Sequence, residues 1–353
     1  MFVDRKLLGS WIGALYLVAG AFGQTYVRID PLAGPPPHPP TRITMPLSIN
    51  EQGAITGWYQ AYASAHITGF VRDPAGAITT FTLGPLSWTL PTSINDSGSI
   101  TGSYQNIVNG RYSGFIRDPQ GNFTSFDPPG SISTSPQSIN AGGVITGSYS
   151  EANQLALGFG HGFVRHDNGT VIRFDPAGSV LTIPLSINAS GAITGYYQEA
   201  NMRAHGFLRE PWGPIVAFDP PGSTATHAVA INDAGVITGY YATSGRTHGF
   251  VRNARGEFTS FDAGAFTAPT SINDEGAITG YYSTTPASGG FGFVRSPEGK
   301  ITSFDPPVDP NGCVGPPGFS IQTLPRSIKR EGVITGFCNT GISPQDTGWV
   351  RYP

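Results

Sequence analysis

The sequence predicts an all-β protein, a seven-bladed β-propeller made of four-stranded antiparallel blades. Three observations carry this prediction: a phrase that recurs about every 45 residues, four short strand-like segments in each recurrence, and chain ends that complement each other. Beyond the first 23 residues, no segment shows a convincing helical period.

The recurring phrase begins Ser-Ile-Asn or Ala-Ile-Asn and reads SINASGAITGYYQ at residues 186–198. Its asparagine stands at Asn50, Asn95, Asn140, Asn188, Asn232 and Asn273, and a seventh, altered copy ends at Lys329. A second phrase, Gly-Phe-Val-Arg or a close variant, follows each copy, with its glycine at Gly69, Gly114, Gly162, Gly206, Gly249, Gly292 and Gly348. This regular period is typical of a repeat architecture.

Each repeat is expected to contain four short strands rich in Val, Ile, Thr, Phe and Tyr. The first strand ends at Ser-Ile-Asn, and the Asn-x-x-Gly after it favours a tight hairpin into the second strand, Ile-Thr-Gly-Tyr-Tyr. The third strand is the Gly-Phe-Val-Arg phrase. Segments such as RDPQG at 117–121 then favour a second hairpin into the fourth strand, which ends in Phe-Asp.

The two chain ends are expected to close the ring. The fourth strand ends repeats two to six at Asp127, Asp175, Asp219, Asp262 and Asp305, and the first repeat has TTFTLG in that place. The seventh repeat stops after its third strand, at GWVRYP. The segment TYVRIDPLAG, with Asp30 after its strand, matches the missing fourth strand. A terminal strand in that place would leave no open sheet edge.

The N-terminal segment 1–23 is predicted to be a secretory signal peptide. Arg5 and Lys6 precede an apolar run, and Ala21 and Gly23 supply the small residues that precede cleavage. A membrane anchor is the alternative, but the run is shorter and richer in glycine than a membrane span requires. The mature chain, 24–353, is therefore expected to be one exported propeller, secreted or periplasmic, without a membrane span and monomeric.

Composition limits the classes of function. The formal net charge is -3 at pH 7, and lysine occurs only at Lys6, Lys300 and Lys329. The absence of a basic stripe argues against nucleic-acid binding. The sequence has no nucleophile motif, phosphate loop or zinc signature, and it indicates no cofactor and no metal.

Cys313 and Cys338 are the only cysteines. In an exported chain such a pair indicates a disulfide bond, although two free thiols are the alternative.

The phrases INDSGSITGSY and SGFIRDPQGNFTSFDPPGS, at 94–104 and 113–131, resemble the bacterial extracellular HAF repeat. In that family a His-Ala-Phe-like segment alternates with Ile-Asn-x-x-Gly-x-Val-x-Gly. Here the triplet has become His-Gly-Phe in three repeats, and Arg replaces the usual Trp after it. The resemblance covers nearly all of residues 25–353 and implies a secreted repeat protein of β-propeller type, without implying an activity.

Residues that differ between repeats are the candidates for ligand binding, because shared residues in a repeat protein usually build the repeat. Histidine precedes Gly-Phe in three consecutive repeats, and the second strands of the same repeats end in tyrosine. The candidate ligand-binding residues are His161, His205, His248, Tyr149, Tyr197 and Tyr241. The competing interpretation is that these histidines form hydrogen bonds to a turn. The seven Arg residues and the Phe-Asp aspartates are expected to be structural.

Two functions remain open from the sequence. The first is a non-catalytic module that binds a carbohydrate or a secreted or cell-surface protein. The second is a secreted lyase or hydrolase in which a histidine and a tyrosine on one face act as base and acid. A propeller can serve either role, so the fold alone does not decide whether the chain is an enzyme.

Overall fold

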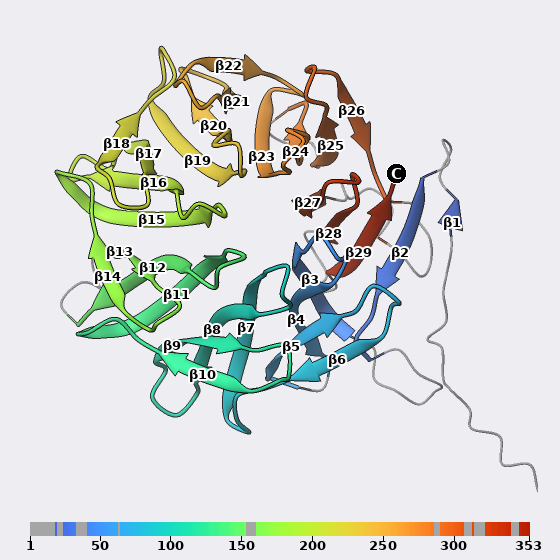
Figure 1. Cartoon of the computed structure of the whole chain (residues 1–353). Helices are drawn as coiled ribbons and strands as arrows, with labels where there is room; N and C mark the ends of the chain where they lie inside the picture. Colours follow the sequence, from blue (N-terminus) through green and yellow to red (C-terminus); the bar gives the residue numbers. More distant parts are fainter. Residues whose placement is uncertain are drawn as a thin grey trace, which may run out of the picture.

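The computed structural model describes residues 18–19, 24–32, 41–62, 64–152, 160–285, 290–306, 313, 322–339 and 346–353. Within these residues the fold is all-β, and the sheets stand around a common centre (Figure 1). The predicted signal peptide lies outside the described residues, apart from β1 (Val18–Ala19), which pairs with β2 (Thr25–Ile29).

The strands associate in antiparallel groups of four that follow the order of the chain. The first group contains β3 (Thr41–Ile49), β4 (Ile55–Ala61), β5 (Ile67–Arg72) and β6 (Ile78–Phe81). The next contains β7 (Ser87–Ile94), β8 (Ile100–Asn106), β9 (Tyr112–Arg117) and β10 (Phe123–Phe126). It is followed by β11 (Ser131–Ile139), β12 (Ile145–Glu151), β13 (His161–Arg165) and β14 (Val171–Phe174).

The second half of the chain repeats the same pattern. One group contains β15 (Ser179–Ile187), β16 (Ile193–Glu199), β17 (Ala204–Arg209) and β18 (Ile215–Phe218). Another contains β19 (Ala225–Ile231), β20 (Ile237–Ala242), β21 (Thr247–Arg252) and β22 (Phe258–Phe261). The next contains β23 (Phe266–Ile272), β24 (Ile278–Ser283), β25 (Phe291–Arg295) and β26 (Ile301–Phe304). The last contains β27 (Gln322–Ile328), β28 (Ile334–Asn339) and β29 (Thr347–Tyr352).

The N-terminal strand completes this last group. β2 pairs antiparallel with β29 over five residue pairs, from Thr25 opposite Tyr352 to Ile29 opposite Gly348. Figure 1 shows the blue and red strands side by side. Single parallel bridges also join neighbouring groups at four places among the described residues, between Tyr112 and Ser133, Gly160 and Leu181, Thr247 and Phe266, and Asp346 and Ile43. The predicted pairing of the chain ends is thus present.

The hairpin between the first two strands of a group forms because its asparagine and glycine play separate roles. In the hairpin after β15, the N–H of Asn188 donates to the carbonyl of Ala192, and the N–H of Gly191 donates to that of Asn188. Gly191 has a φ of 89°, which favours glycine. A Cβ on Gly195, in the next strand, would lie 2.1 Å from the carbonyl oxygen of Ile183, so the close approach of the two strands also requires glycine.

The core consists of apolar layers between neighbouring groups. In one layer Val164 and Phe174 of one group pack with Ile187, Ile193 and Phe207 of the next. Ile193 and Phe207 are fully buried, and each contributes about 2 kcal/mol to stability by leaving water. Val27 and Ile29 of β2 join the core of the first group in the same way. Figure 1 shows the first strand of each group on the inner side of the molecule, and the turns after these strands line one cavity.

Candidate functional site

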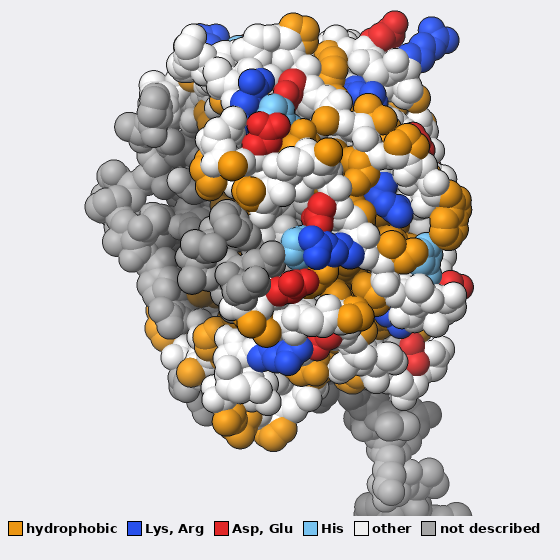
Figure 2. Space-filling model, turned by 90° about the vertical axis from the view of Figure 1, so that its left-hand side faces the viewer, with side chains coloured by type: hydrophobic (Ala, Val, Ile, Leu, Met, Phe, Trp, Pro, Cys, Tyr) orange, Lys and Arg blue, Asp and Glu red, His pale blue; other side chains and the backbone are white. Residues whose placement is uncertain are grey.

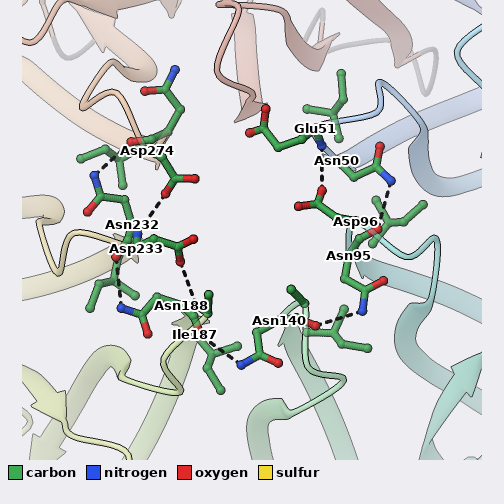
Figure 3. Close-up of a pocket in the computed structure, with 18 of the residues that line it drawn as sticks. Asn50, Glu51, Asn95, Asp96, Asn140, Ile187, Asn188, Asn232, Asp233 and Asp274 are labelled. Atoms are coloured by element: carbon green, nitrogen blue, oxygen red, sulfur yellow. Dashed lines mark hydrogen bonds between the residues drawn. The ribbon is translucent and has the colours of Figure 1, made fainter.

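A row of asparagines joins the turns at the centre of the molecule (Figure 3). The Nδ2 of Asn188 donates to the backbone carbonyl of Asn232 in the next group, at 3.1 Å. The same bond, at 2.9–3.1 Å, starts from Asn50, Asn95, Asn140, Asn188, Asn232 and Asn273. Each Oδ1 also accepts a backbone N–H four residues ahead, as from Ala192 to Asn188. The recurring asparagine therefore holds its own turn through Oδ1 and joins it to the next group through Nδ2.

Lys329 takes the place of asparagine in the last group. It provides the carbonyl that accepts the bond from Asn273, at 3.0 Å. Its own Nζ donates to the backbone carbonyl of Glu51, beside the first asparagine, at 3.3 Å, and also contacts Glu331. A longer side chain thus links the last group to the first, and the altered phrase SIK keeps the role of SIN.

The recurring serine forms a second row of bonds. Ser186 Oγ accepts the N–H of Ile231 in the next group, at 3.3 Å, and Ser327 Oγ accepts the N–H of Ile49, at 3.4 Å. The Ser-Ile-Asn phrase therefore joins adjacent groups through two hydrogen bonds, one from its asparagine and one to its serine.

A cavity of about 180 Å³ lies among these turns. It is lined by the Ile-Asn phrases and by the residues after them, which include Glu51, Asp96, Asp233 and Asp274. The carboxylates accept hydrogen bonds from neighbouring turns: Asp96 from the N–H of Glu51 at 2.9 Å, and Asp274 from the guanidinium of Arg330 at 2.8 Å. No cluster of three or more His, Cys, Asp or Glu within the described residues could hold a metal ion. The carboxylates at this cavity therefore join the turns of neighbouring groups.

The six candidate ligand-binding residues form three separate pairs. The rings of Tyr149 and His161 are tilted, with centroids 5.4 Å apart, whereas Tyr197 stacks on His205 at 5.3 Å and Tyr241 on His248 at 5.1 Å. Each pair joins the second and third strands of a single group. None of the six lines the central cavity. The structure does not bring the three histidines together, and their role in ligand binding stays a prediction.

Each of these histidines meets the aspartate that ends the fourth strand of its group. The Nδ1 atoms of His161, His205 and His248 lie 2.9, 2.6 and 2.8 Å from Asp175, Asp219 and Asp262. Asp175 and Asp219 also accept a hydrogen bond from a threonine of the next group, Thr182 at 2.8 Å and Thr226 at 2.5 Å. Figure 2 shows histidine, acidic and basic side chains gathered in small groups on one side of the molecule.

Groups without the histidine keep the rest of this arrangement. Thr134 donates to Asp127 at 2.5 Å, although the histidine position of that group is Ser113. Thr323 donates to Asp305 at 2.6 Å, and there Phe291 stacks near Tyr282 at 5.5 Å in the histidine's place. The threonine–aspartate bond is therefore present at Asp127, Asp175, Asp219 and Asp305. After Asp262 the corresponding Thr267 instead accepts the N–H of Ala263 at 3.0 Å.

Burial changes the acidity of the tyrosines beside these histidines. It raises the pKa of Tyr149 and of Tyr197 above the ordinary value of 10.0. Both phenols therefore keep their protons at neutral pH.

The repeated arginines are structural, as predicted. The guanidinium of Arg165 lies 5.1 Å from the ring centroid of Phe126 in the preceding group, and its Nη1 donates to the carbonyl of His166 at 3.1 Å. The same stacking on a phenylalanine recurs at Arg117, Arg209, Arg252, Arg295 and Arg351.

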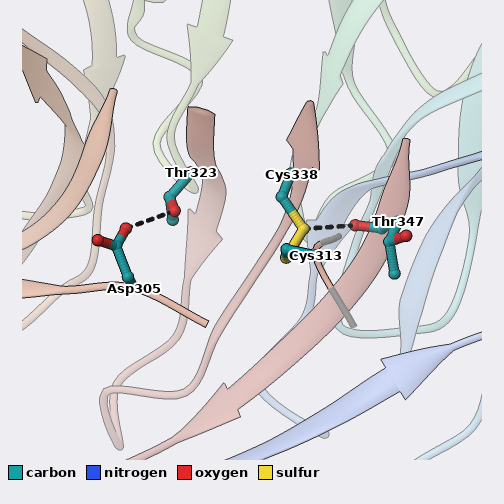
Figure 4. The surroundings of a disulfide bond; sticks show 5 residues. All are labelled: Asp305, Cys313, Thr323, Cys338 and Thr347. Carbon is teal, nitrogen blue, oxygen red and sulfur yellow. Dashed lines mark hydrogen bonds between the residues drawn. A yellow bond between two sulfur atoms is a disulfide. The ribbon is translucent and has the colours of Figure 1, made fainter. Parts of the chain in front are cut away.

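The predicted disulfide bond is present (Figure 4). Cys313 and Cys338 are bonded with their Cα atoms 5.8 Å apart, and both side chains are buried. The bond ties residue 313 to the second strand of the last group. Closing a loop of 25 residues contributes roughly 3 kcal/mol in the chain-entropy description. No helix within the described residues has the length and apolar character needed to cross a membrane.

Sequence reasoning missed a second set of residues, on the inner strands beside the first tyrosine of each Tyr-Tyr pair. Tyr196 and His227 have ring centroids 4.4 Å apart, and His227 stacks on Tyr240 at 4.8 Å. Arg326 lies on the inner strand β27. The signal that could have found His227 and Arg326 is that each departs from its repeat at a position where other repeats carry uncharged residues.

Neither a protein-family model nor a curated protein sequence matches this chain. Solved structures do match its fold. A streptogramin B lyase matches with a TM-score of 0.57 and 14% identity, over 93% of this chain and 98% of the lyase chain. The β-propeller domain of the Trilobed protease from Pyrococcus furiosus matches with a TM-score of 0.58 and 10% identity, over 87% and 92% of the two chains. The fold is therefore of the β-propeller kind, and at such low identity the likeness concerns the fold alone.

Proposed function

We propose that this chain is a secreted, seven-bladed β-propeller of the HAF-repeat kind that binds a carbohydrate or protein at the cell surface and catalyses no reaction. Each group of four strands is one blade, and β2 is the fourth strand of the seventh. Closure of the ring is supported by the pairing of β2 with β29 and by the bond from Lys329 to Glu51. The disulfide bond supports an oxidising compartment.

The proposal of a non-catalytic role rests on the burial of His161 and on its bond to Asp175. A catalytic histidine needs a free face toward a substrate, whereas His161 is 9% exposed and bonded to Asp175. The replacement of histidine by Phe291 in an otherwise equivalent blade supports a packing role.

The variable connections supply a surface for a partner. Leu86, Ile107 and Val108 are 53%, 39% and 77% exposed, on the β6–β7 and β8–β9 connections, which emerge on the same face. The N–H of Ile107 donates to the carbonyl of Leu86 at 3.1 Å, so the two connections are joined. Exposed aliphatic side chains held on a rigid scaffold suit an apolar partner surface.

Binding of the purified mature chain to a glycan array and to secreted and cell-surface proteins tests this role. We expect a bound partner whose affinity falls at least about tenfold in the double variant Leu86→Asp, Val108→Asp, because charge is placed in a desolvated contact. Trp212→Asp, at an 82% exposed residue of the β17–β18 turn, is the matched control and should bind as the unmodified chain does. Equal loss in both variants, or no loss in either, contradicts the proposed surface.

One observation favours the alternative, a secreted lyase or hydrolase. Asp219 holds Nδ1 of His205, and the buried Nε2 of the same ring has no hydrogen-bond partner among the described residues and lies 3.9 Å from Glu199. With Tyr197 stacked on the ring, this blade holds a candidate base and acid. Turnover of a secreted polymer that disappears in His205→Gln and in Tyr197→Phe would replace the binding role with this one.

A further inference from the structure

A continuous row of five aromatic rings crosses three neighbouring groups on their two inner strands. His227 of β19 lies between two tyrosines, with its ring centroid 4.4 Å from that of Tyr196 in β16 and 4.8 Å from that of Tyr240 in β20. Tyr240 contacts Phe266 of β23 at 6.5 Å, and Phe266 contacts Tyr281 of β24 at 5.9 Å between centroids. All five residues are half-buried, so part of the row stays in contact with solvent.

The repeat does not require rings at these places. Two other groups carry Ser103 and Ser148 where the first tyrosine of Ile-Thr-Gly-Tyr-Tyr stands. The residues paired with these serines, Leu90 and Ser135, also lack a ring at the position that corresponds to His227. Both groups nevertheless form the same four-stranded pairing. The rings therefore need a reason other than the pairing of the strands.

The polar atoms of the row lack partners inside the protein. The second tyrosine of a Tyr-Tyr pair is bonded, as Tyr282 is to Ser303 at 2.8 Å between hydroxyl oxygens. Among the described residues, by contrast, no hydrogen bond reaches the side-chain polar atoms of four members of the row: Tyr196, His227, Tyr240 and Tyr281. These atoms are not fully buried either, so water reaches them and a ligand can replace that water.

The centre of the row is uncharged at neutral pH. Burial raises the pKa of Tyr240 to about 12 and also raises the pKa of Tyr196. Burial lowers the pKa of His227 below its ordinary value of 6.5. The phenols therefore keep their protons and can donate, whereas the neutral imidazole can both donate and accept.

We propose that Tyr196, His227 and Tyr240 form a binding site for a neutral sugar ring, and that Phe266 and Tyr281 extend it to a second ring of an oligosaccharide. The aromatic faces cover the apolar side of a sugar ring, and the hydroxyl and imidazole groups bond to its hydroxyls. A charged sugar would lose water there without gaining a counter-charge.

This site adds a second ligand to the proposed function, because it lies on the inner strands and the surface at Leu86 and Val108 lies on the outer connections. Either site can fail without the other. The double variant Leu86→Asp, Val108→Asp should therefore bind the sugar as the unmodified chain does.

Calorimetric titration of the mature chain with maltotriose, cellotriose and mannotriose tests the site, with sorbitol as the comparison ligand. Sorbitol carries the hydroxyls of a sugar but has no ring face that could stack. We expect at least one trisaccharide to bind, and sorbitol to bind at least about tenfold more weakly.

Three tyrosine variants locate the binding. Tyr240→Phe removes an unpartnered hydroxyl and should weaken trisaccharide binding about two- to tenfold, because one hydrogen bond to the ligand is lost. Tyr282→Phe is the matched control, since it removes a hydroxyl that is already bonded to Ser303, and it should bind as the unmodified chain does. Tyr240→Ser introduces the residue of two other groups, so it should fold in circular dichroism and bind at least about tenfold more weakly.

The proposal is overturned if none of the trisaccharides binds or if sorbitol binds equally well. It is also overturned if Tyr240→Phe binds as tightly as Tyr282→Phe, or if folded Tyr240→Ser binds like the unmodified chain. Loss of trisaccharide binding in the Leu86→Asp, Val108→Asp variant would place the sugar at the outer connections instead.

Discussion

The two ends of the inner strands differ in how far they vary between blades. At the turn end, serine, isoleucine and asparagine recur, and the serine and asparagine donate to or accept from the next blade. Immediately before the serine position, the same strands carry different residues, such as Leu185, Val229 and Arg326. Residues that must meet a copy of themselves cannot vary alone, whereas residues outside these recurring bonds can. The recurring end therefore joins neighbouring groups, and the position before it varies without breaking these bonds.

The largest effect is expected from removing β2, the N-terminal strand that pairs with the C-terminal strand β29. Deleting residues 24–31 removes β2, including the buried Tyr26, Val27 and Ile29. The lost burial alone amounts to roughly 5 kcal/mol or more, comparable with the whole stability of many domains. We expect aggregation or a loss of cooperative melting in size-exclusion chromatography and circular dichroism. Arg28→Gln, which keeps the strand, should remain monomeric. If the truncated chain melted like the full chain, the side-chain bonds at the turns would be enough to hold the groups together without β2.

Asn188→Ala tests the turn end directly. It removes the bond to the carbonyl of Asn232 and the acceptor for the N–H of Ala192, both buried, and should lower the free energy of unfolding by about 2–3 kcal/mol. Urea unfolding measures the change. Asn168→Ala, in the exposed turn between β13 and β14, loses only a local bond to Thr170 and should cost less than about 1 kcal/mol. Similar losses in both variants would contradict the special role of the central row.

The histidine pairs offer an intermediate case. His205→Phe imitates Phe291, so it should change the free energy of unfolding by less than about 1 kcal/mol. Asp219→Ala removes the acceptor of both Thr226 and His205 and should cost about 2 kcal/mol. Thermal and urea unfolding of the two variants measure the difference. A larger loss in His205→Phe than in Asp219→Ala would make the histidine, rather than the aspartate, the structural residue.

The smallest expected effect is a pH dependence at the varied part of the strands. Burial between Tyr196 and Tyr240 lowers the pKa of His227 below 6.5. The unfolded chain therefore takes up a proton more readily, so the stability contributed by neutral His227 is present above pH 6.5 and lost as the pH falls below it. Between pH 7.5 and 5.5, the melting temperature should fall less steeply for His227→Leu than for the unmodified chain. Identical slopes would mean that His227 is not buried in its neutral form.

Much of the fold was predictable because each repeat contains the turn residues that mark where its strands end. Asn188 to Gly191 and the segment around Asp118 to Gly121 form the predicted hairpins, with the glycines at φ of 89° and 94°. The beginning of the first strand was not predicted. β15 begins at Ser179, but the pairing irregularity between Pro184 and Ser186 interrupts the alternation that marks a strand. Matching positions in neighbouring repeats predicted the six candidate residues, and the structure shows that each histidine lies against the tyrosine of its own group, while their role in ligand binding stays a prediction.

The sequence by itself determined the period, the four strands of each repeat, the complementary chain ends and the cysteine pair, because all of these depend on local turn chemistry and on counting. Only the tertiary structure decided what the recurring residues contact. Asn188 reaches a carbonyl 44 residues away, and His205 meets an aspartate 14 residues away. The guanidinium of Arg326 lies 5.0 Å from the ring centroid of Phe337 in the neighbouring strand. Such contacts depend on how one sheet lies against the next, and the spacing of residues along the chain does not contain that information.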